Sequence, residues 1–493
     1  MAMITAPFLF PWDAIEARTD LERFFLVRDN LPDEKIIQYL EVMRGNGRDD
    51  FPILPMWNAL IAGIVFQHPS IEHLIRELSR NPSLLGACGF NPLPIQKKPK
   101  AKLVKNEETG RMEIVWPQPD TPHYMVPSSW NFSRFLMNVI ELEKSLDLIS
   151  NLTVLLRAQL MEELPDFGVH LGYDGKAIPS HSTGQVNKET QQTSDPDADW
   201  GKHETSGVNS KTGKKWNKIK SWFGYELHLI ADTKHEIPVA FEITQASHSD
   251  QTIVNNMIPS TLDQDPELAE RCEDFVSDRG LDSAEIKTIF LDDYNIRPFI
   301  DTRQLWQTEK KEPDYDPSQP IIRPLYPDRG DTIFYNEKGT LQCVCPVTKE
   351  QRAMCFQGFE ADRGTLKFRC PAAASGINCA GQKSCHAAGG VNPGLFGRTI
   401  RVPIDKDRRI FMPTPHGTPS WERTFNRRSA LERINSRIDN SFGFEFHFIR
   451  GKAKMQTRVG LALAVMMAMA LGHVREQRHD QMRSLVKPIP IAA

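Results

Sequence analysis

Three acidic residues occupy positions at which a carboxylate can do chemistry. Asp174 lies at the end of an alternating pattern in FGVHLGYDGKAI, Asp278 follows the apolar run of DFVSDRG, and Glu432 lies in the helical pattern RRSALERINSRI. A single acidic residue at such a place is most often a solvated surface charge. Three converging carboxylates, however, offer the oxygen ligands that Mg²⁺ prefers and leave room for water and phosphate. The set therefore predicts a site for two Mg²⁺ or Mn²⁺ ions and for phosphoryl transfer, with Asp282 as the alternative to Asp278.

Hydrophobic periodicity predicts the elements that would position these acids. The expected strands are residues 169–174, 223–231, 237–244, 274–277 and 297–300, and the expected helices include 282–291 and 420–440. An antiparallel meander followed by strand, helix and strand, and then by a late helix, is the element order of a ribonuclease-H-like domain, in which two strand ends and one helix meet. We therefore expect an α/β fold with a mixed sheet, flanking helices and a ribonuclease-H-like core.

The rest of the chain divides by composition. Helical stripes between residues 30 and 89 fit either a helix-turn-helix module or a plain helical bundle. The expected regions are an N-terminal helical domain that binds DNA (1–90), a Pro- and Lys-rich linker with a long helix (91–164), the first part of the catalytic core (165–303), a Cys-rich and β-rich insertion (304–410), the second part of the core (411–474) and a polar tail (475–493).

Two further segments have distinctive compositions. Residues 181–220 are polar and rich in Gly and Lys, which predicts a mobile basic loop. The apolar run Val459–Gly472 is too short to cross a bilayer, so we expect a buried helix. The N-terminus has no basic region before its short apolar run and does not resemble a signal peptide. These features predict a cytoplasmic protein.

Several segments together resemble bacterial insertion-sequence transposases of the DDE type, which belong to the ribonuclease-H-like superfamily. The resemblance lies in LGYDGKAIPS, GYELHLIADTKHEIPVAFEITQASHSDQ, SDRGLDS, RPFIDTR, FNRRSALERINSRI and, upstream, WNALIAGIVFQHPSIEHLIRELSRNPSLLGACGF. It places the acidic triad of the family on Asp174, Asp278 and Glu432. It implies binding to terminal inverted repeats and target DNA, a homodimer in the DNA complex and a location at the bacterial nucleoid.

A signature of many such transposases is only partly present. Phe425 stands where the signature has Tyr, Arg428 and Glu432 occupy its next two places, and Asp439 replaces its Lys. Arg428, one helical turn before Glu432, can contact a phosphate or orient the carboxylate, or it can simply form an ion pair. The residues that we expect to neutralise DNA phosphates are Arg427, Arg428, Arg433, Arg437, Lys214, Lys215 and Lys218. Trp216 and Trp222 fit either base stacking or core packing.

Six of the eight cysteines lie within the insertion. They are Cys343, Cys345, Cys355, Cys370, Cys379 and Cys385, and none of their spacings is the CxxC of a standard zinc knuckle. Structural Zn²⁺ would stabilise a segment that is rich in Gly and Pro, whereas reduced, buried thiols would need no metal. The spacing does not decide which four would be ligands.

The sequence contains none of the motifs that we considered for other enzyme classes. The formal net charge is −3, and the sequence has no GxGxxG, P-loop, HExxH or GxSxG pattern. We therefore expect a DNA transposase that cleaves element ends and joins them to target DNA. Two alternatives remain: an inactive DNA-binding or regulatory descendant, and a ribonuclease-H-like nuclease without strand transfer.

Overall fold

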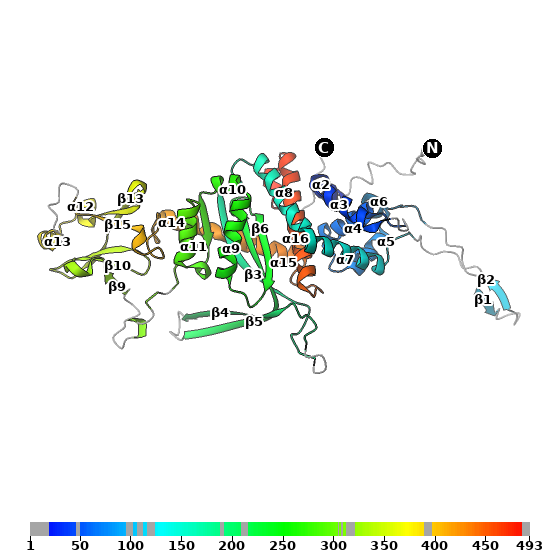
Figure 1. Cartoon of the computed structure of the whole chain (residues 1–493), viewed down its shortest axis with the longest axis horizontal. Helices are drawn as coiled ribbons and strands as arrows, with labels where there is room; N and C mark the ends of the chain where they lie inside the picture. The colour runs from blue at the N-terminus through cyan, green and yellow to red at the C-terminus, as the bar shows by residue number, and fades with distance from the viewer. Residues whose placement is uncertain are drawn as a thin grey trace.

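A mixed six-stranded sheet forms the centre of the protein, with helices on both of its faces (Figure 1). The computed structural model describes residues 19–45, 50–94, 102–105, 112–115, 124–187, 192–208, 215–303, 305–306, 309–311, 321–388 and 397–485. The N-terminal helices lie on one side of this sheet and the insertion lies on the other, so the molecule is elongated. An α/β class with a mixed sheet and flanking helices is thereby confirmed.

The sheet combines an antiparallel and a parallel part. Strand β3 (His170–Pro179) pairs antiparallel with β5 (Lys215–Asp232), which pairs antiparallel with β6 (Ile237–Gln245). On its other side β3 pairs parallel with β7 (Asp274–Ser277), which pairs parallel with β8 (Arg297–Ile300). The strand order across the sheet is thus β6-β5-β3-β7-β8. The predicted antiparallel meander is formed by β3, β5 and β6, and the predicted parallel strands are β7 and β8.

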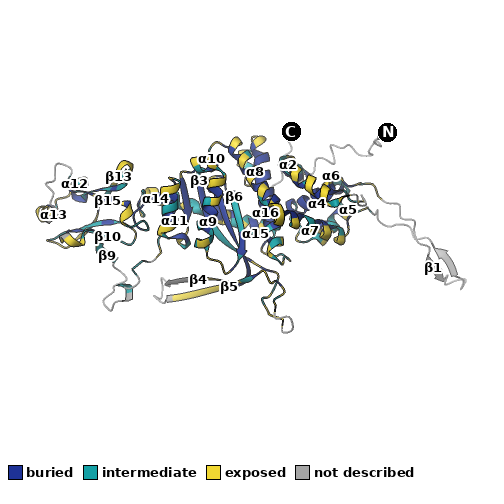
Figure 2. Ribbon diagram, in the orientation of Figure 1, coloured by how far each residue is buried: buried dark blue, intermediate teal, exposed yellow. Residues whose placement is uncertain are grey.

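The segment that was predicted to be a basic loop differs from its prediction. Strand β4 (Asp199–Val208) pairs with residues 215–224 of β5, so a two-stranded ribbon occupies much of the predicted basic loop. The ribbon extends beyond the end of β6, and residues 202–204 of β4 and 216–220 of β5 are exposed on it (Figure 2). Its strand structure follows from continuous backbone pairing, which needs no buried face and therefore leaves little hydrophobic signal in the sequence. Lys214 lies outside the described residues.

Two helices cover opposite faces of β3. A Cβ atom on Gly172 would lie 3.1 Å from Leu431 of α15 (Ser429–Phe442), whereas a Cβ on Gly175 would lie 3.2 Å from Asp250 of α9 (Asp250–Gln264). Because successive residues of a strand point to opposite faces, α15 covers the face of Asp174 and α9 covers the other. The remaining helices of this region are α10 (Pro266–Arg271), α11 (Ala284–Thr288) and α14 (Pro419–Phe425).

The predicted buried helix is α16 (Lys452–Arg475), which packs against β6 and four helices of the N-terminal half. Its length and apolarity would suffice to cross a membrane, but 94% of its apolar window is buried inside the protein. The predicted tail is partly packed, because Met482 and Leu485 are buried and Arg23 donates to the Leu485 carbonyl at 2.8 Å. The helices packed against α16 are α2 (Thr19–Asn30), α4 (Ile53–Val65), α7 (Ser129–Leu146) and α8 (Leu148–Glu163).

The N-terminal domain contains more helices than the stripes indicated. The three predicted stripes form α3 (Glu34–Arg44), α4 and α5 (Ile71–Arg80), while α2 and α6 (Pro82–Cys88) were not predicted. Every residue of α4 except Leu54 is buried, so α4 belongs to the core of this domain. It therefore has no free face with which to enter a DNA groove.

The single long helix expected near residues 132–164 is in fact two helices. Asp147 adopts a left-handed conformation, with φ 49°, between α7 and α8. The buried Glu143 carboxylate accepts hydrogen bonds from the Ile149 and Ser150 amides at 2.6 and 3.2 Å. A carboxylate at these amides satisfies donors that have no partner in the first turn of a helix, so α8 starts afresh there.

The insertion has a hydrophobic core of its own. The described residues of the insertion form two small antiparallel sheets, ordered β12-β11-β10-β9 and β13-β14-β15, and two short α-helices. Their bounds are β9 (Ile322–Pro324), β10 (Ile333–Asn336), β11 (Leu341–Val344), β12 (Gln351–Ala353), β13 (Cys355–Glu360), β14 (Thr365–Arg369), α12 (Pro371–Ser375), α13 (Gln382–Ala388) and β15 (Thr399–Pro403). In the predicted linker, β1 (Lys102–Lys105) and β2 (Met112–Val115) form an antiparallel hairpin.

Candidate metal centre

Asp174 and Asp278 lie on neighbouring parallel strands. Gly172 of β3 is paired with Val276 of β7, and Asp174 and Asp278 each follow two residues later. The same number of residues beyond the same register pair places both side chains side by side on the α15 face. The Gly280 amide donates to Asp278 Oδ1 at 2.7 Å, which orients the carboxylate. Asp174 is partly buried, and Asp278 is exposed at the end of its strand.

Helix α15 brings Glu432 to this pair. Arg428, Glu432, Asn435 and Asp439 are spaced by three or four residues, so they share one side of the helix. Asn435 Nδ2 donates to Asp174 Oδ2 at 2.8 Å, and Asp439 Oδ2 accepts from Lys176 Nζ of β3 at 2.6 Å. These two contacts orient the polar side of α15 toward β3. Glu432 lies one turn before Asn435, with its side chain 57% exposed and paired with Arg428 at 2.7 Å.

The charges of the site act on one another. The pKa of Asp174 is raised to about 6, first by burial and then by the charges of Asp278, Glu432 and Asp250. Arg428 acts in the opposite direction, and its positive charge lowers the pKa of Asp174. The charges of Asp278 and Glu432 thus both act on Asp174, and a divalent cation would relieve this repulsion. Asp174 lies in the middle of β3, whereas the sequence pattern predicts it at the end of its strand. Among the described residues, the acids and histidines whose ligand atoms all lie within 4.8 Å of one another are a different group.

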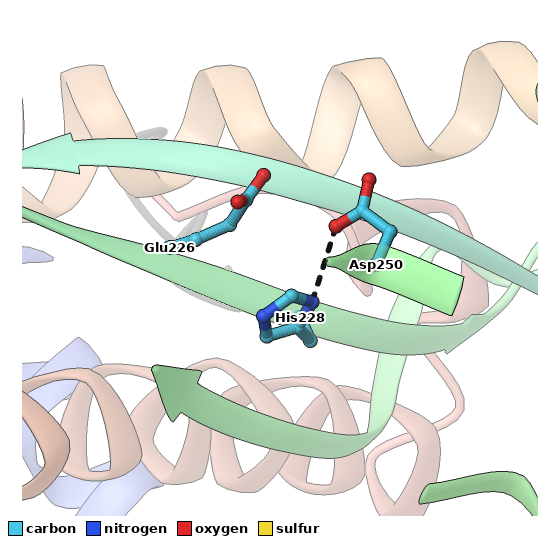
Figure 3. A group of neighbouring side chains, drawn as sticks. All are labelled: Glu226, His228 and Asp250. Atoms are coloured by element: carbon cyan, nitrogen blue, oxygen red, sulfur yellow. Dashed lines mark ion pairs between the residues drawn. The ribbon is translucent and has the colours of Figure 1, made fainter. Parts of the chain in front are cut away.

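A second group of ligand atoms, which sequence reasoning missed, lies on the opposite face of β3. Glu226, His228 and Asp250 each place one such atom within 4.8 Å of the others (Figure 3). Burial, and then the charges of Asp250 and Asp174, raise the pKa of Glu226 to about 8. The signals in the sequence were the alternation of Glu226 and His228 in an apolar strand and the position of Asp250 at a strand-to-helix junction. Neither carries a motif.

The histidine of this group is already fully hydrogen-bonded. His228 Nδ1 lies 2.7 Å from the Tyr173 hydroxyl, and Nε2 lies 2.8 Å from Thr244 Oγ1. Burial lowers the pKa of His228 to about 4, so the ring is neutral at pH 7. The Tyr173 hydroxyl in turn donates to Asp250 Oδ1 at 3.0 Å. His228 therefore supports Tyr173 and Asp250 rather than offering a free metal ligand.

Asp282, the alternative to Asp278, is a structural residue. It is buried, and its carboxylate accepts from Lys287 Nζ at 2.8 Å, from Arg409 at 2.8 Å and from the Arg303 amide at 2.9 Å. Its oxygens are thus occupied by cationic or amide donors and leave no place for a metal ion. Asp278 is the better candidate.

The predicted phosphate contacts fall into different environments. Arg433 and Arg437 both pair with the buried Glu236, and Arg427 lies 3.4 Å from Asp274, so protein carboxylates already compensate these charges. Arg428 pairs with Glu432, as described above. Lys218 is exposed on the β4–β5 ribbon, and the side chain of Lys215 and the whole of Lys214 lie outside the described residues.

The two tryptophans of the ribbon region also differ. Trp222 is buried and donates from Nε1 to the Tyr225 carbonyl at 3.1 Å, so it is a core residue. Trp216 is 46% exposed on the ribbon. Only Trp216 is therefore placed to meet a ligand.

Five of the six insertion cysteines line one cavity of about 110 Å³: Cys343, Cys345, Cys370, Cys379 and Cys385. Burial and then the neighbouring Cys370, Cys385 and Cys379 raise the pKa of Cys343 to about 11. Cys385 Sγ lies 3.0 Å from Thr332 Oγ1, whereas Cys345 Sγ accepts from the Thr348 amide at 3.4 Å. Cys355 lies on β13 and does not line the cavity.

Comparison of the sequence with models of known protein families found no match, and comparison with curated proteins found none either.

Proposed function

We propose that this protein is a DDE-type DNA transposase with a ribonuclease-H-like core. The observation that carries the proposal is the position of Asp174 and Asp278 on neighbouring parallel strands, with Glu432 on the covering helix near enough for its charge to act on Asp174. The strand order, with an antiparallel meander on one side of β3 and parallel strands on the other, supports the same core. The substrate would be DNA, at the terminal inverted repeats and at the target site.

The residues of the site would have different roles in metal binding and orientation. Asp174, Asp278 and Glu432 would hold two Mg²⁺ or Mn²⁺ ions, which activate the attacking water or 3′-hydroxyl and stabilise the leaving oxygen. Asn435 orients the Asp174 carboxylate, and the Gly280 amide orients that of Asp278. Asp250 adds negative charge behind the site and strengthens its attraction for cations.

The β4–β5 ribbon is the part of the described structure that is best suited to meet DNA. It exposes Lys202, Lys218 and Lys220 together with Trp200 and Trp216. Lysines can neutralise backbone phosphates, and exposed aromatic rings can stack on bases. Because transposition acts on two element ends, we also propose a homodimer in the DNA complex, and the nucleoid as the place of action.

A Mg²⁺-dependent assay on labelled element ends tests this function. The wild-type protein should nick the ends and join the freed 3′-hydroxyl to a target plasmid, while Asp174→Asn should bind the ends and do neither. Glu422→Gln, an exposed acid of α14 outside the site, is the matched control and should remain active. End binding without nicking by the wild type would favour the inactive descendant, and nicking without joining would favour the nuclease.

We also propose that Cys343, Cys370, Cys379 and Cys385 bind structural Zn²⁺. Four thiolates are a common ligand set for Zn²⁺ in proteins, and these four cysteines line one cavity of the insertion. Metal analysis of the purified full chain should find one Zn²⁺ per molecule. Cys343→Ser and Cys379→Ser should lose it, and Cys345→Ser and Cys355→Ser should retain it. Full occupancy in Cys379→Ser would contradict the assignment.

A further inference from the structure

One cavity among the described residues lies away from the carboxylates. It encloses about 580 Å³ between α4, α5 and α7 of the N-terminal domain and the segment that runs from the end of α15 into α16. Most of its wall is apolar, with Leu74, Phe444 and Leu461 among the lining residues. This volume is in the range of sites for small organic ligands.

Arg458 supplies an uncompensated positive charge to this wall. It lines the cavity from α16, and its side chain makes no hydrogen bond or ion pair with any residue that the structure describes. Burial lowers the pKa of Arg458 to about 10, so the guanidinium remains charged at pH 7. Arg458 is half-buried in a largely apolar wall, where a charge without a partner is costly, and an anion from outside the chain would reduce that cost.

Positively charged residues also outnumber acidic ones among the other residues that line the cavity. Arg450 and Lys454 also line the cavity, and its one acidic lining residue is Glu72, whose carboxylate accepts from Ser129 at 3.0 Å. His68 Nε2, which also lines the cavity, is a buried polar atom that has no partner within the described chain. The cavity therefore combines a mostly apolar wall with hydrogen-bond donors and positive charge. These properties favour a ligand that is partly apolar and carries a negative charge.

Backbone contacts hold the wall of the cavity in place. The His181 amide donates to the Ile449 carbonyl at 3.0 Å, and Arg450 Nε donates to the His181 carbonyl at 2.9 Å. The rings of His181 and Phe448 meet edge to face, with their centroids 5.1 Å apart. The segment after α15 is thereby attached to the residues that follow β3, so the site is formed by packed elements on both sides.

We infer that this cavity binds a nucleotide, with its phosphate at Arg458 and its base among the aromatic and apolar side chains. Arginine binds phosphate oxygens through two parallel hydrogen bonds, and bases pack well against aromatic rings. The nucleotide is either free or part of a DNA strand. The second source rests on the proposed function: His181 follows Asp174 by seven residues, about 23 Å of extended chain, which is within reach of DNA bound at the carboxylates.

Titration calorimetry on the full chain tests this inference with three probes: inorganic phosphate, dAMP and single-stranded (dT)₁₂ with a 5′-phosphate. Binding of dAMP would show a site for a free nucleotide, and binding of (dT)₁₂ alone would show a site for a nucleotide within a strand. Arg458→Met should weaken binding at least tenfold. Arg475→Met, on the same helix but paired with Glu163, is the matched control and should leave binding unchanged.

Three results would overturn the inference. They are no binding of dAMP or (dT)₁₂ by the wild type, binding of phosphate alone, and equal binding by Arg458→Met. Thermal unfolding separates a binding role from a structural one, since Arg458→Met should unfold at or above the temperature of the wild type, and a clearly lower temperature would contradict the binding role. Asp174→Asn should still bind the nucleotide, so a failure of the transposase proposal would be recognised separately.

Discussion

Charged residues are compensated in one region of the protein and uncompensated in another. Around Asp282 and Glu236, buried carboxylates meet lysine and arginine side chains in direct ion pairs. Around Asp174 the neighbouring charges are mostly other carboxylates, and its pKa is raised. Compensated charges hold elements together, whereas uncompensated charges remain available to an ion or ligand from outside. The contrast separates the structural acids from the acids of the proposed site more clearly than burial does.

Two arginines show the same contrast between a compensated and an uncompensated charge, here for positive charges. Burial lowers the pKa of both Arg437 and Arg458. Arg437 pairs with Glu236, while Arg458 makes no ion pair within the described structure and lines a cavity. One arginine therefore serves the fold, and the other has free hydrogen-bonding capacity.

The largest effect should come from an uncompensated acid. Asp278→Asn removes a proposed metal ligand, so DNA nicking should fall by about a thousandfold or more, while the unfolding free energy should stay within roughly 1 kcal/mol of the wild type. Nicking rates with Mg²⁺ and urea unfolding measure the two quantities. A variant that nicks at more than a tenth of the wild-type rate would show that Asp278 is not a ligand.

Substitution of a compensated acid should mainly lower the stability of the protein. Asp282→Asn leaves Lys287 buried beside a neutral amide, and we expect a loss of about 3 kcal/mol in the free energy of unfolding. Urea unfolding of the two Asn variants, at positions 278 and 282, gives the direct comparison. Equal stability of these two variants would remove the distinction between the regions.

The acidic site should also affect how stability depends on pH. The pKa of Asp174 is raised from 3.8 to about 6, so in the unfolded chain this group ionises at lower pH than in the folded protein. Stability should therefore fall as pH rises from about 4 to 6, and Asp174→Asn should remove this fall. At pH 7 without metal we expect the variant to be about 1 to 2 kcal/mol more stable, since partial exposure screens the charge.

The measurement is urea unfolding at pH 4, 5, 6 and 7 in EDTA, repeated with Mg²⁺. The metal should stabilise the wild type at pH 7 and have little effect on Asp174→Asn. A wild-type stability that rises across this pH range, relative to that of the variant, would contradict the raised pKa.

The smallest effect should come from the ion pair between Lys176 and Asp439. Lys176→Asp or Asp439→Lys alone places like charges together, and we expect each to cost about 1 kcal/mol of stability. The double exchange should recover most of that loss, and a double-mutant cycle measures the coupling. Additive losses would show that the pair does not hold α15 to β3. The exchange would also place Lys where the transposase signature has it.

The elements near the acids were predictable, because short apolar runs between turns mark strands. The predicted strands at 274–277 and 297–300 coincide with β7 and β8, and Asp174, Asp278 and Glu432 could be chosen as a set. Asp250 and Glu226 could not, since their proximity depends on α9 returning across β3, which no local spacing records. The division between α7 and α8 depends likewise on one side chain, Glu143, that folds forward to cap the next helix.

The central position of α16 has a consequence for protein synthesis. This helix comes from the last tenth of the chain, yet it packs against α2, α4, α7 and α8, which are made first. While the ribosome is still translating the insertion, these early helices expose the apolar surface that α16 will cover. We therefore expect nascent chains to depend on chaperones until termination is near, and chains that end before residue 452 to aggregate instead of yielding an active fragment.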